Sequence, residues 1–291
     1  MKKFCPACLK NKTKNRIKVP DFEYGLPYSA EYFECYHCGT NFQKPMPTLR
    51  KISSYYPKSY HSFKSLGILK VIRSWMRLVG LKKFINFNDK ILDFGCGNGD
   101  FLFFASKSFP KCLFYGYEIS FKNEIKKYNH ERVVIIKGSI DFLISKIPEI
   151  KIITMNHTIE HLIDPEKVLK KLKEKIKIGG IIDGQTPASD SFEKSLFKKY
   201  WSGFHSPRHT VIFSRSGLKN LTLRAGMRKI IIKPAFNPAS YAVSFHSYLF
   251  ENKKIARKGL VWFIFIIMGS FFSIFDLILL SPGVINFRIY R

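Results

Sequence analysis

A glycine-rich turn between two apolar runs limits the possible folds of this chain more than any other feature. Residues 91–100 read ILDFGCGNGD, and an apolar run rich in phenylalanine follows over residues 101–105. This pattern predicts a strand, a tight loop and a helix. Gly95, Gly97 and Gly99 let the backbone bend sharply and approach a ligand at the N-terminus of that helix. A glycine-rich turn alone is weak evidence, so the segments that follow must decide what it binds.

The next strand-like segment ends in an acid. Residues 113–119 are mostly apolar and aromatic and carry Glu118, which lies 19 residues after Gly99. A carboxylate at about that separation can accept hydrogen bonds from both hydroxyls of a ribose. The alternative is a solvent-exposed glutamate at a strand end. The first interpretation is favoured because three more segments follow in order.

Those three segments are apolar runs that each end in a polar turn. They are residues 133–141, which include Ser139, Ile140 and Asp141; residues 151–165, which include Asn156 and the run HTIEHLIDP; and residues 178–182, IGGII. Helix-length stretches separate the motifs, and a basic helix is expected over residues 165–177.

In this order and spacing the motifs resemble those of the class I S-adenosylmethionine-dependent methyltransferases, over roughly residues 50 to 291. The loop pattern D-x-G-x-G-x-G differs from the G-x-G-x-x-G of dinucleotide-binding proteins. The resemblance implies an α/β fold with a doubly wound, mostly parallel, seven-stranded Rossmann-like sheet and a reversed last strand. It also implies that S-adenosylmethionine contacts Asp93, Gly95, Cys96, Gly97, Gly99, Glu118, Ile119, Ser139, Ile140, Asp141 and Asn156. Many members carry an acid where this chain has Ser139, so Asp141 or the backbone near Ile140 would bind the adenine.

The fourth segment also contains a possible metal motif. His157, Glu160 and His161 match the inverted motif of zinc proteases, in which both histidines bind zinc. We reject a protease because the motif begins at a strand end and no third ligand is identifiable downstream. The same three side chains could hold a divalent cation near the substrate. The interpretation that we favour for Glu160 is that it caps and orients the loop over the cofactor, together with His161.

Residues 200–209, YWSGFHSPRH, are similar to a segment that follows the fifth strand in one subfamily of these methyltransferases. An insertion there lies over the carboxyl ends of the strands, where ligands bind in open α/β sheets. Arg208 could therefore bind an anionic group of the substrate. A neutral imidazole could take a proton from the acceptor. The candidates are His157, His161, His205 and His209, of which the first two lead; the alternative for each is a structural hydrogen bond.

Two C-x-x-C pairs near the N-terminus predict a metal site. Cys5 and Cys8 form one pair, and Cys35 and Cys38 form the other, 26 residues further on. Four thiolates at this spacing suit one structural Zn²⁺ in a zinc ribbon, and Gly39 allows the tight turn under the metal. Metal binding would supply folding free energy to a segment with little core. Disulfides are not expected because no signal peptide precedes Cys5, which indicates a reducing compartment.

Two other segments could contact a membrane. Residues 63–85 carry apolar residues at helical spacing among basic ones; this helix could lie on a membrane, but we prefer a helix that closes the cofactor pocket. Residues 260–280 contain one charge, Asp276, and are long enough to span a bilayer. Residues 284–290 resemble the family's last strand, which must return to the sheet. We therefore expect a break at 269–270 and a shallow hairpin at the membrane surface; the alternative is a dimer interface.

The net charge of +28 is extreme, and the lysines are spread along the chain. Such a surface attracts phosphates of anionic lipid, nucleic acid or an activated substrate. We predict a zinc ribbon over 1–43, a linker and helical cap over 44–90, the cofactor-binding core over 91–235, and a hydrophobic helical insertion with the last strand over 236–291.

The predicted function is methyl transfer from S-adenosylmethionine to a small or lipid-linked acceptor. The resemblance suggests a sugar of surface-glycan biosynthesis. The expected location is the cytoplasm, peripheral or monotopic on the inner face of the cytoplasmic membrane. The alternatives are an RNA methyltransferase, which the charge suggests, and a non-catalytic membrane-bound scaffold that holds the cofactor.

Overall fold

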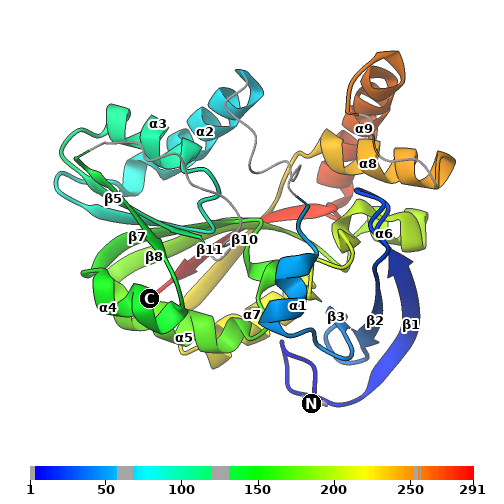
Figure 1. The fold of residues 1–291 in the computed structure, drawn as a ribbon, viewed down its shortest axis with the longest axis horizontal. Coiled ribbons are helices and arrows are strands. Elements are labelled where there is room, and N and C mark those ends of the chain that lie inside the picture. The colour runs from blue at the N-terminus through cyan, green and yellow to red at the C-terminus, as the bar shows by residue number, and fades with distance from the viewer. Residues whose placement is uncertain (1–3, 58–67, 119–130, 252–254, 256) are drawn as a thin grey trace.

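The computed structural model describes residues 4–57, 68–118, 131–251, 255 and 257–291 (Figure 1). Its largest element is a seven-stranded sheet in the order β10-β11-β8-β7-β4-β5-β6. The strands are β4 (Lys90–Phe94), β5 (Leu113–Glu118), β6 (Val133–Lys137), β7 (Ile150–Asn156), β8 (Ile176–Pro187), β10 (Lys229–Pro234) and β11 (Val284–Tyr290). The first five run parallel, and β11 lies antiparallel between β8 and β10. The predicted doubly wound, mostly parallel sheet with a reversed last strand is confirmed.

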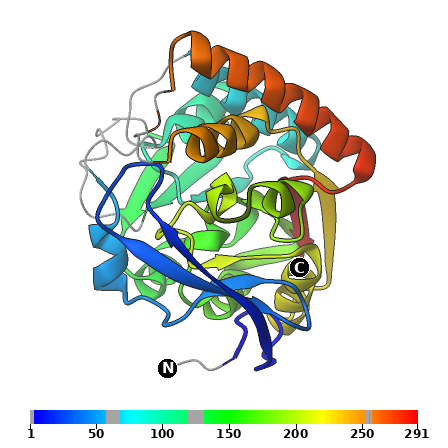
Figure 2. The ribbon, with the colours of Figure 1, turned by 90° about the vertical axis from the view of Figure 1, so that its right-hand side faces the viewer.

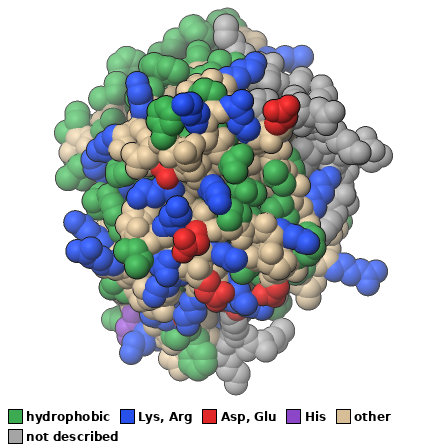
Figure 3. All heavy atoms as spheres, turned by 90° about the vertical axis from the view of Figure 1, so that its left-hand side faces the viewer, with side chains coloured by type: hydrophobic (Ala, Val, Ile, Leu, Met, Phe, Trp, Pro, Cys, Tyr) green, Lys and Arg blue, Asp and Glu red, His purple; other side chains and the backbone are tan. Residues whose placement is uncertain are grey.

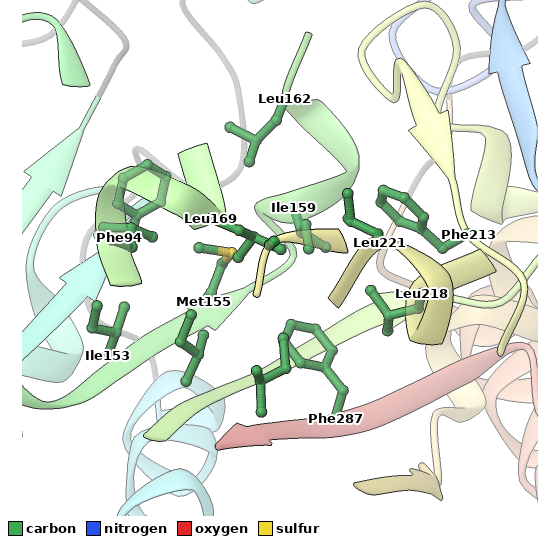
Figure 4. Packing of buried hydrophobic residues seen from close by; sticks show 14 of the residues in the cluster. Phe94, Ile153, Met155, Ile159, Leu162, Leu169, Phe213, Leu218, Leu221 and Phe287 are labelled. Carbon is green, nitrogen blue, oxygen red and sulfur yellow. The ribbon is translucent and has the colours of Figure 1, made fainter. Parts of the chain in front are cut away.

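Helices cover both faces of this sheet because its central strands are apolar on both sides. In Figure 1, α2 (Ile68–Leu81) and α3 (Asp100–Ser108) lie on one face, and α4 (Ile140–Lys146), α5 (Pro165–Lys175) and α7 (Arg215–Arg224) lie on the other. Neighbouring residues of β4 enter opposite clusters: Ile91 packs with side chains of α2 and α3, and Leu92 packs with those of α5 and α7. Figure 4 shows Leu169 and Leu221 in the second cluster.

A second sheet joins the N-terminal segment to the rest of the chain. It contains β1 (Thr13–Pro20), β2 (Ser29–Cys35), β3 (Asn41–Gln43) and β9 (Val211–Ile212), in that order and all antiparallel. Phe42 pairs with Val211, which lies far along the chain after β8. Figure 2 shows β1 and β2 crossing the face turned toward the viewer. The N-terminal strands therefore lie beside the loops at the carboxyl ends of the parallel strands.

The C-terminal apolar segment is one continuous helix, so the predicted break at residues 269–270 is wrong. Helix α9 (Leu260–Leu279) packs on α8 (Pro238–Leu249). A Cβ on Gly269 would lie 2.3 Å from the carbonyl oxygen of Pro238. This glycine therefore allows close contact between two helices and does not end one. As expected, β11 then returns to the large sheet.

Shorter helical segments complete the structure. They are α1 (Leu49–Ser54), α6 (Phe192–Phe197) and the 3-10 turns η2 (Lys82–Phe84), η3 (Ile159–His161), η4 (Lys198–Tyr200) and η5 (Ser202–Phe204). The amphipathic helix predicted over residues 63–85 is present as α2, and residues 63–67 lie outside the described part of the chain.

Candidate functional site

The glycine-rich loop joins β4 to α3, and its backbone requires glycine. Gly95, Gly97 and Gly99 have φ angles of 85°, 53° and 79°, in the left-handed region that other residues rarely adopt. A Cβ on Gly95 would also lie 2.3 Å from Oγ1 of Thr158. The amide of Gly97 donates to Oε2 of Glu118 at 2.9 Å. The loop and the carboxylate at the end of β5 thus lie together in the wall of one large cavity.

Arg77 of α2 completes this wall and was not predicted as a site residue. Its Nη2 lies 2.9 Å from Oδ1 of Asp93, and its guanidinium lies 3.9 Å from the ring centre of Phe101. The side-chain oxygen of Asn156, in the amide orientation that satisfies both groups, accepts from Nε and Nη2 at 2.9 Å each. Asp93 is buried and also accepts from Oγ1 of Thr154 at 2.6 Å. A cation thus lies beside the loop, held by two predicted cofactor residues.

The other predicted cofactor residues around this loop differ in their surroundings. Cys96 is buried and lines the cavity, and burial raises the pKa of its thiol. Gly99 is the N-cap residue of α3. Ile119 lies outside the described residues.

The turn after β6 forms a second part of the cavity wall. Ser139 caps α4, because its Oγ accepts from the amide of Phe142 at 3.2 Å. Asp141 is exposed and pairs with Lys171 at 3.0 Å, and this pair lowers the pKa of the Asp141 carboxyl. Ser139, Ile140 and Asp141 all line the cavity. The structure therefore brings this turn and the glycine loop to one site.

The four predicted histidines gather at another part of the same cavity. His157 follows β7, His161 ends η3, and His205 and His209 lie between η5 and β9. The ring centre of His161 is 4.6 Å from that of His209 and 6.2 Å from that of His205. All four line the cavity. Loops that follow β7 and β8 thus meet at the carboxyl ends of the parallel strands, where ligands bind in such folds.

Glu160 lies buried beneath these rings. Its Oε2 accepts from Oγ1 of Thr186 at 2.9 Å, and its Oε1 lies 3.3 Å from Nδ1 of His157. Burial alone would raise the pKa of Glu160, but the hydrogen bond with His157 and the nearby imidazoles lower it to about 2. Its backbone carbonyl accepts from the amide of Thr210 at 2.8 Å. An ionised carboxylate therefore ties the turn after β7 to the segment before β9.

Hydrogen-bond partners distinguish His157 from His161. Nε2 of His157 lies 2.9 Å from Oε1 of Gln185, and its Nδ1 faces Glu160, so both ring nitrogens of His157 face acceptors. Nδ1 of His161 lies 3.2 Å from the carbonyl of Arg208 and 3.0 Å from Oη of Tyr56. Because a carbonyl only accepts, Nδ1 of His161 carries the proton and Nε2 keeps its lone pair.

Burial also sets the charge of three of these rings. It lowers the pKa of His161, and it places the pKa of His205 and of His209 well below the ordinary histidine value. These imidazoles are therefore neutral near pH 7. Neutral His161 has the form that a proton acceptor requires.

The loop after β1 holds the histidine segment from the other side. Arg208 is fully buried, where it pairs with Asp21, and its Nε donates to the carbonyl of Tyr55 at 2.9 Å. The expected role of Arg208 in binding a substrate anion is therefore wrong, because its guanidinium is taken up by internal partners. Glu23 pairs with His205 through Nδ1. Asp21 and Glu23 carried no motif that would have marked them in the sequence.

Strands β2 and β3 add contacts to the same segment. Oη of Tyr32 donates to the carbonyl of His209 at 2.9 Å, and Nε2 of Gln43 donates to that carbonyl at 2.8 Å. Nε2 of Gln43 also donates to the carbonyl of Pro207 at 2.7 Å. The N-terminal sheet therefore positions the backbone on which two candidate histidines lie.

Among the described residues, two groups have the composition of a metal site. Sγ of Cys5 lies 3.7 Å from that of Cys38, Sγ of Cys8 lies 3.5 Å from that of Cys35, and all four sulfurs lie within 4.8 Å of one another. Sulfurs about 2.3 Å from a tetrahedral Zn²⁺ would be about 3.8 Å apart, so these cysteines fit zinc.

The second group contains Glu160, His161 and His209, whose ligand atoms also lie within 4.8 Å of one another. Nδ1 of His209 lies 2.8 Å from the carbonyl of Gly203, so each histidine can donate through Nδ1 and present Nε2. A divalent cation could be held here. His209 takes the place that the sequence had suggested for His157.

Comparisons with known proteins agree with this geometry. A family model described as a methyltransferase domain matches residues 69–230. A SAM-dependent methyltransferase from Archaeoglobus fulgidus is 18% identical, with a TM-score of 0.50 over 76% of this chain and 94% of that chain. Phosphoethanolamine N-methyltransferase 2 from Haemonchus contortus, solved with S-adenosyl-L-methionine, is 14% identical, with a TM-score of 0.53 over 86% of this chain and 60% of that chain. These structural matches show the fold alone. No curated protein matches the chain.

Proposed function

We propose, from the premise that this chain belongs to the methyltransferase-domain family, that its cavity holds methyl donor and acceptor side by side. The chain is an S-adenosylmethionine-dependent methyltransferase. When bound, the cofactor supplies a methyl group on a positively charged sulfur, so catalysis depends mainly on aligning donor and acceptor. The observation that carries the proposal is that the glycine loop, Glu118 and the histidines line one cavity.

Different residues of the glycine-loop wall would bind different parts of the cofactor. Glu118, at the end of β5, would accept hydrogen bonds from the ribose hydroxyls. The loop from Gly95 to Gly99 would let the backbone approach the amino-acid part of the cofactor, and the cationic Arg77 would pair with its carboxylate. The turn with Ser139, Ile140 and Asp141 would bind the adenine.

We propose His161 as the proton acceptor. Its neutral ring and the Nε2 lone pair support this role, whereas both nitrogens of His157 face acceptors. His205 and His209 are held by Glu23 and by the carbonyl of Gly203, and they would keep the pocket in shape. Nε2 of His161 would take the proton that the acceptor loses when it is methylated.

The acceptor would be a small or lipid-linked molecule with hydroxyl groups, such as a sugar of surface-glycan biosynthesis. Support comes from amide side chains that line the cavity, among them Gln185, Asn286 and Asn237, because amides both donate to and accept from hydroxyls. Oε1 of Gln185 lies 2.9 Å from Nε2 of His157. The lining also includes apolar Phe236, Val243, Trp262 and Ile266, which suit an apolar carrier. The proposed location is the inner face of the cytoplasmic membrane.

Isothermal titration with S-adenosylhomocysteine tests the cofactor assignment. Wild-type protein should bind at micromolar concentrations, and Glu118→Ala should weaken binding by roughly tenfold or more, because hydrogen bonds to a charged group contribute about 1.5–3 kcal/mol. Glu174→Ala changes an exposed glutamate on α5 and should leave binding unchanged. Equal binding by all three proteins would contradict the proposed site.

A further inference from the structure

Helix α9 exposes only apolar side chains. Eleven of its residues are exposed, and all are Leu, Val, Ile, Met or Phe, with exposed fractions from 37% at Met268 to 75% at Leu260. At 3.6 residues per turn they cover a continuous arc of about 160°. The opposite side, with Phe265, Gly269, Ser273 and Asp276, is buried against the protein. By length and composition α9 could cross a membrane, and most of its residues are not buried in the protein.

Helix α2 presents a second apolar stripe. Val71, Ile72, Trp75, Met76 and Val79 recur at spacings of three and four residues, and each is 39–61% exposed. On the opposite side of the helix, Ser74, Leu78 and Leu81 are buried. A stripe of this kind on an outer helix is unusual for a surface that faces only water. Both helices therefore carry apolar faces that the described residues do not cover.

Both helices line the same cavity. Met76 and Val79 of α2 line the cavity, and so do Trp262 and Ile266 of α9. In the views of Figures 1 and 2, α2 and α9 both lie at the upper end of the molecule. In Figure 3, hydrophobic side chains gather along that upper edge, whereas lysines and arginines are spread over the face below it. The cavity thus reaches both apolar surfaces.

Charge on these helices favours an anionic bilayer over a second protein copy. The sequence of α2 contains no acid, and the one acid of α9, Asp276, is buried and accepts from Oη of Tyr241 at 2.9 Å. The exposed Lys82 and Lys83 follow α2, and the exposed Lys258 precedes α9. Basic residues at the edges of an apolar surface contact anionic headgroups favourably. Two copies that met here would bring these lysines together.

We propose that α2 and α9 dock together on an anionic membrane, so that the cavity opens toward the lipid and a lipid-linked acceptor reaches His161 from the bilayer. Helix α9 would lie in the membrane plane, because its packing on α8 through Gly269 prevents it from spanning the bilayer alone. The identity of the lipid-linked acceptor and of His161 as its partner rests on the proposed function. The docking surface is inferred from the exposed apolar residues of α2 and α9 alone.

Vesicle flotation tests the surface. Wild-type protein should float with vesicles of phosphatidylglycerol and phosphatidylcholine and should bind pure phosphatidylcholine more weakly. The variant Phe271→Asp, Ile278→Asp changes residues that are 71% and 72% exposed, and it should bind the anionic vesicles at least about tenfold more weakly. The matched control Ile178→Asp changes a residue that is 90% exposed elsewhere, and its binding should equal that of wild type. Equal binding by all proteins would overturn the proposal.

Tryptophan fluorescence tests whether α2 docks as well. The variant Trp262→Phe keeps Trp75, which is 57% exposed, and Trp201, which is 2% exposed. Vesicles with brominated lipid chains should quench its emission, and the further change Trp75→Phe should remove that quenching. Absence of quenching through Trp75 would overturn docking at the cavity entrance.

Two further measurements separate the remaining outcomes. Sedimentation without vesicles tests for a dimer interface, which a dimeric wild type and a monomeric Phe271→Asp, Ile278→Asp variant would identify. A dimer interface of this kind, together with a wild type that does not float with vesicles, would overturn the proposal. Titration with S-adenosylhomocysteine should give the same affinity for wild type and this variant. If the wild type did not bind S-adenosylhomocysteine, the proposed function would be overturned and the docking proposal would still stand.

Discussion

The two sides of the cavity are built in different ways. The cofactor side is built around one continuous unit, from Lys90 in β4 through the glycine loop to Glu118 in β5, in which Gly97 contacts Glu118. Arg77, Asn156 and the turn at Ser139 add to it from other elements. The acceptor side includes contacts between residues that are 105 and 187 positions apart, namely Tyr56 with His161 and Asp21 with Arg208. One side therefore depends on local backbone geometry and the other on tertiary packing, which predicts that they can be disabled separately.

Loss of the zinc ion that we propose for the four-cysteine group should have the largest effect, and the effect should be confined to the acceptor side. The variant Cys38→Ser should lose zinc and unfold the N-terminal sheet, so methyl transfer should stop, because Tyr32 and Gln43 would no longer hold the histidine segment. Affinity for S-adenosylhomocysteine should change by less than about threefold, as for independent sites.

Metal analysis and titration calorimetry check both parts of this prediction. Cys112→Ser makes the same chemical change at a buried cysteine outside the cluster and should keep the metal and the activity. Loss of cofactor binding together with the metal would show that the two sides fold as one unit.

Gly95→Ala should have the opposite effect to Cys38→Ser: it should weaken cofactor binding and leave the four-cysteine group intact. The added Cβ would meet Oγ1 of Thr158 at 2.3 Å at a φ of +85°, so the loop must shift and cofactor affinity should fall by roughly 100-fold or more. Gly25→Ala is the matched control, because Gly25 also has a positive φ of +63° but no atom within 4 Å. Calorimetry should show wild-type binding for the control, and metal analysis should give the same metal content for both variants as for wild type. Near-normal binding by Gly95→Ala would contradict the tight loop.

His161→Gln should lower the rate of methyl transfer and leave cofactor binding unchanged. Loss of a general base costs about 10²–10⁴-fold in rate. Because burial lowers the pKa of His161, the wild-type rate should be constant near pH 7 and fall only when the pH drops below that reduced pKa, where the ring becomes charged. The rate of the His161→Gln variant should not show this fall at low pH. A rate within a few-fold of wild type would assign the base elsewhere.

The same contrast explains how much of the structure the sequence could predict. The sheet and the glycine loop were predictable because their patterns are local: apolar runs, glycines and an acid at fixed spacing. Four histidines were proposed from nearby motifs. The rings of His161, His205 and His209 lie together, and His157 joins them through Glu160. Arg77 lies on a helix whose periodicity indicated packing, but periodicity does not show that one arginine reaches Asp93.

The partners of the acceptor side could not be predicted from the sequence. Glu23 meets His205 across 182 positions, and no local pattern links them. The continuous α9 was also missed, because glycine and serine within an apolar run resemble a helix break. Their role becomes visible only when α8 is seen to pass within reach of Gly269.

The smallest predicted effect concerns Glu193 of α6, a buried carboxylate that packs against α8. It accepts from the hydroxyls of Ser240 at 2.7 Å and Ser244 at 2.8 Å on α8. Burial raises its pKa to about 7, and the nearby Asp276 adds to this, against the serine hydrogen bonds. Between its ordinary value of 4.5 and about 7, the folded state holds a proton that the unfolded chain releases. Stability from this group is therefore fully present below 4.5 and falls as the pH rises toward 7.

Glu193→Gln isolates the contribution of Glu193 ionisation to stability, because the amide stays neutral at every pH. The wild type should lose stability relative to the variant as the pH rises from 4.5 to 8, by an amount on the order of 3 kcal/mol. Urea unfolding across this range measures the difference, with the exposed Glu174→Gln as the control that should show none. A difference that does not change with pH would mean that Glu193 is already ionised at pH 5. The two buried carboxylates, Glu160 and Glu193, would then both stay ionised from pH 8 down to pH 5. The first buried groups to change charge as the pH falls would be the histidines.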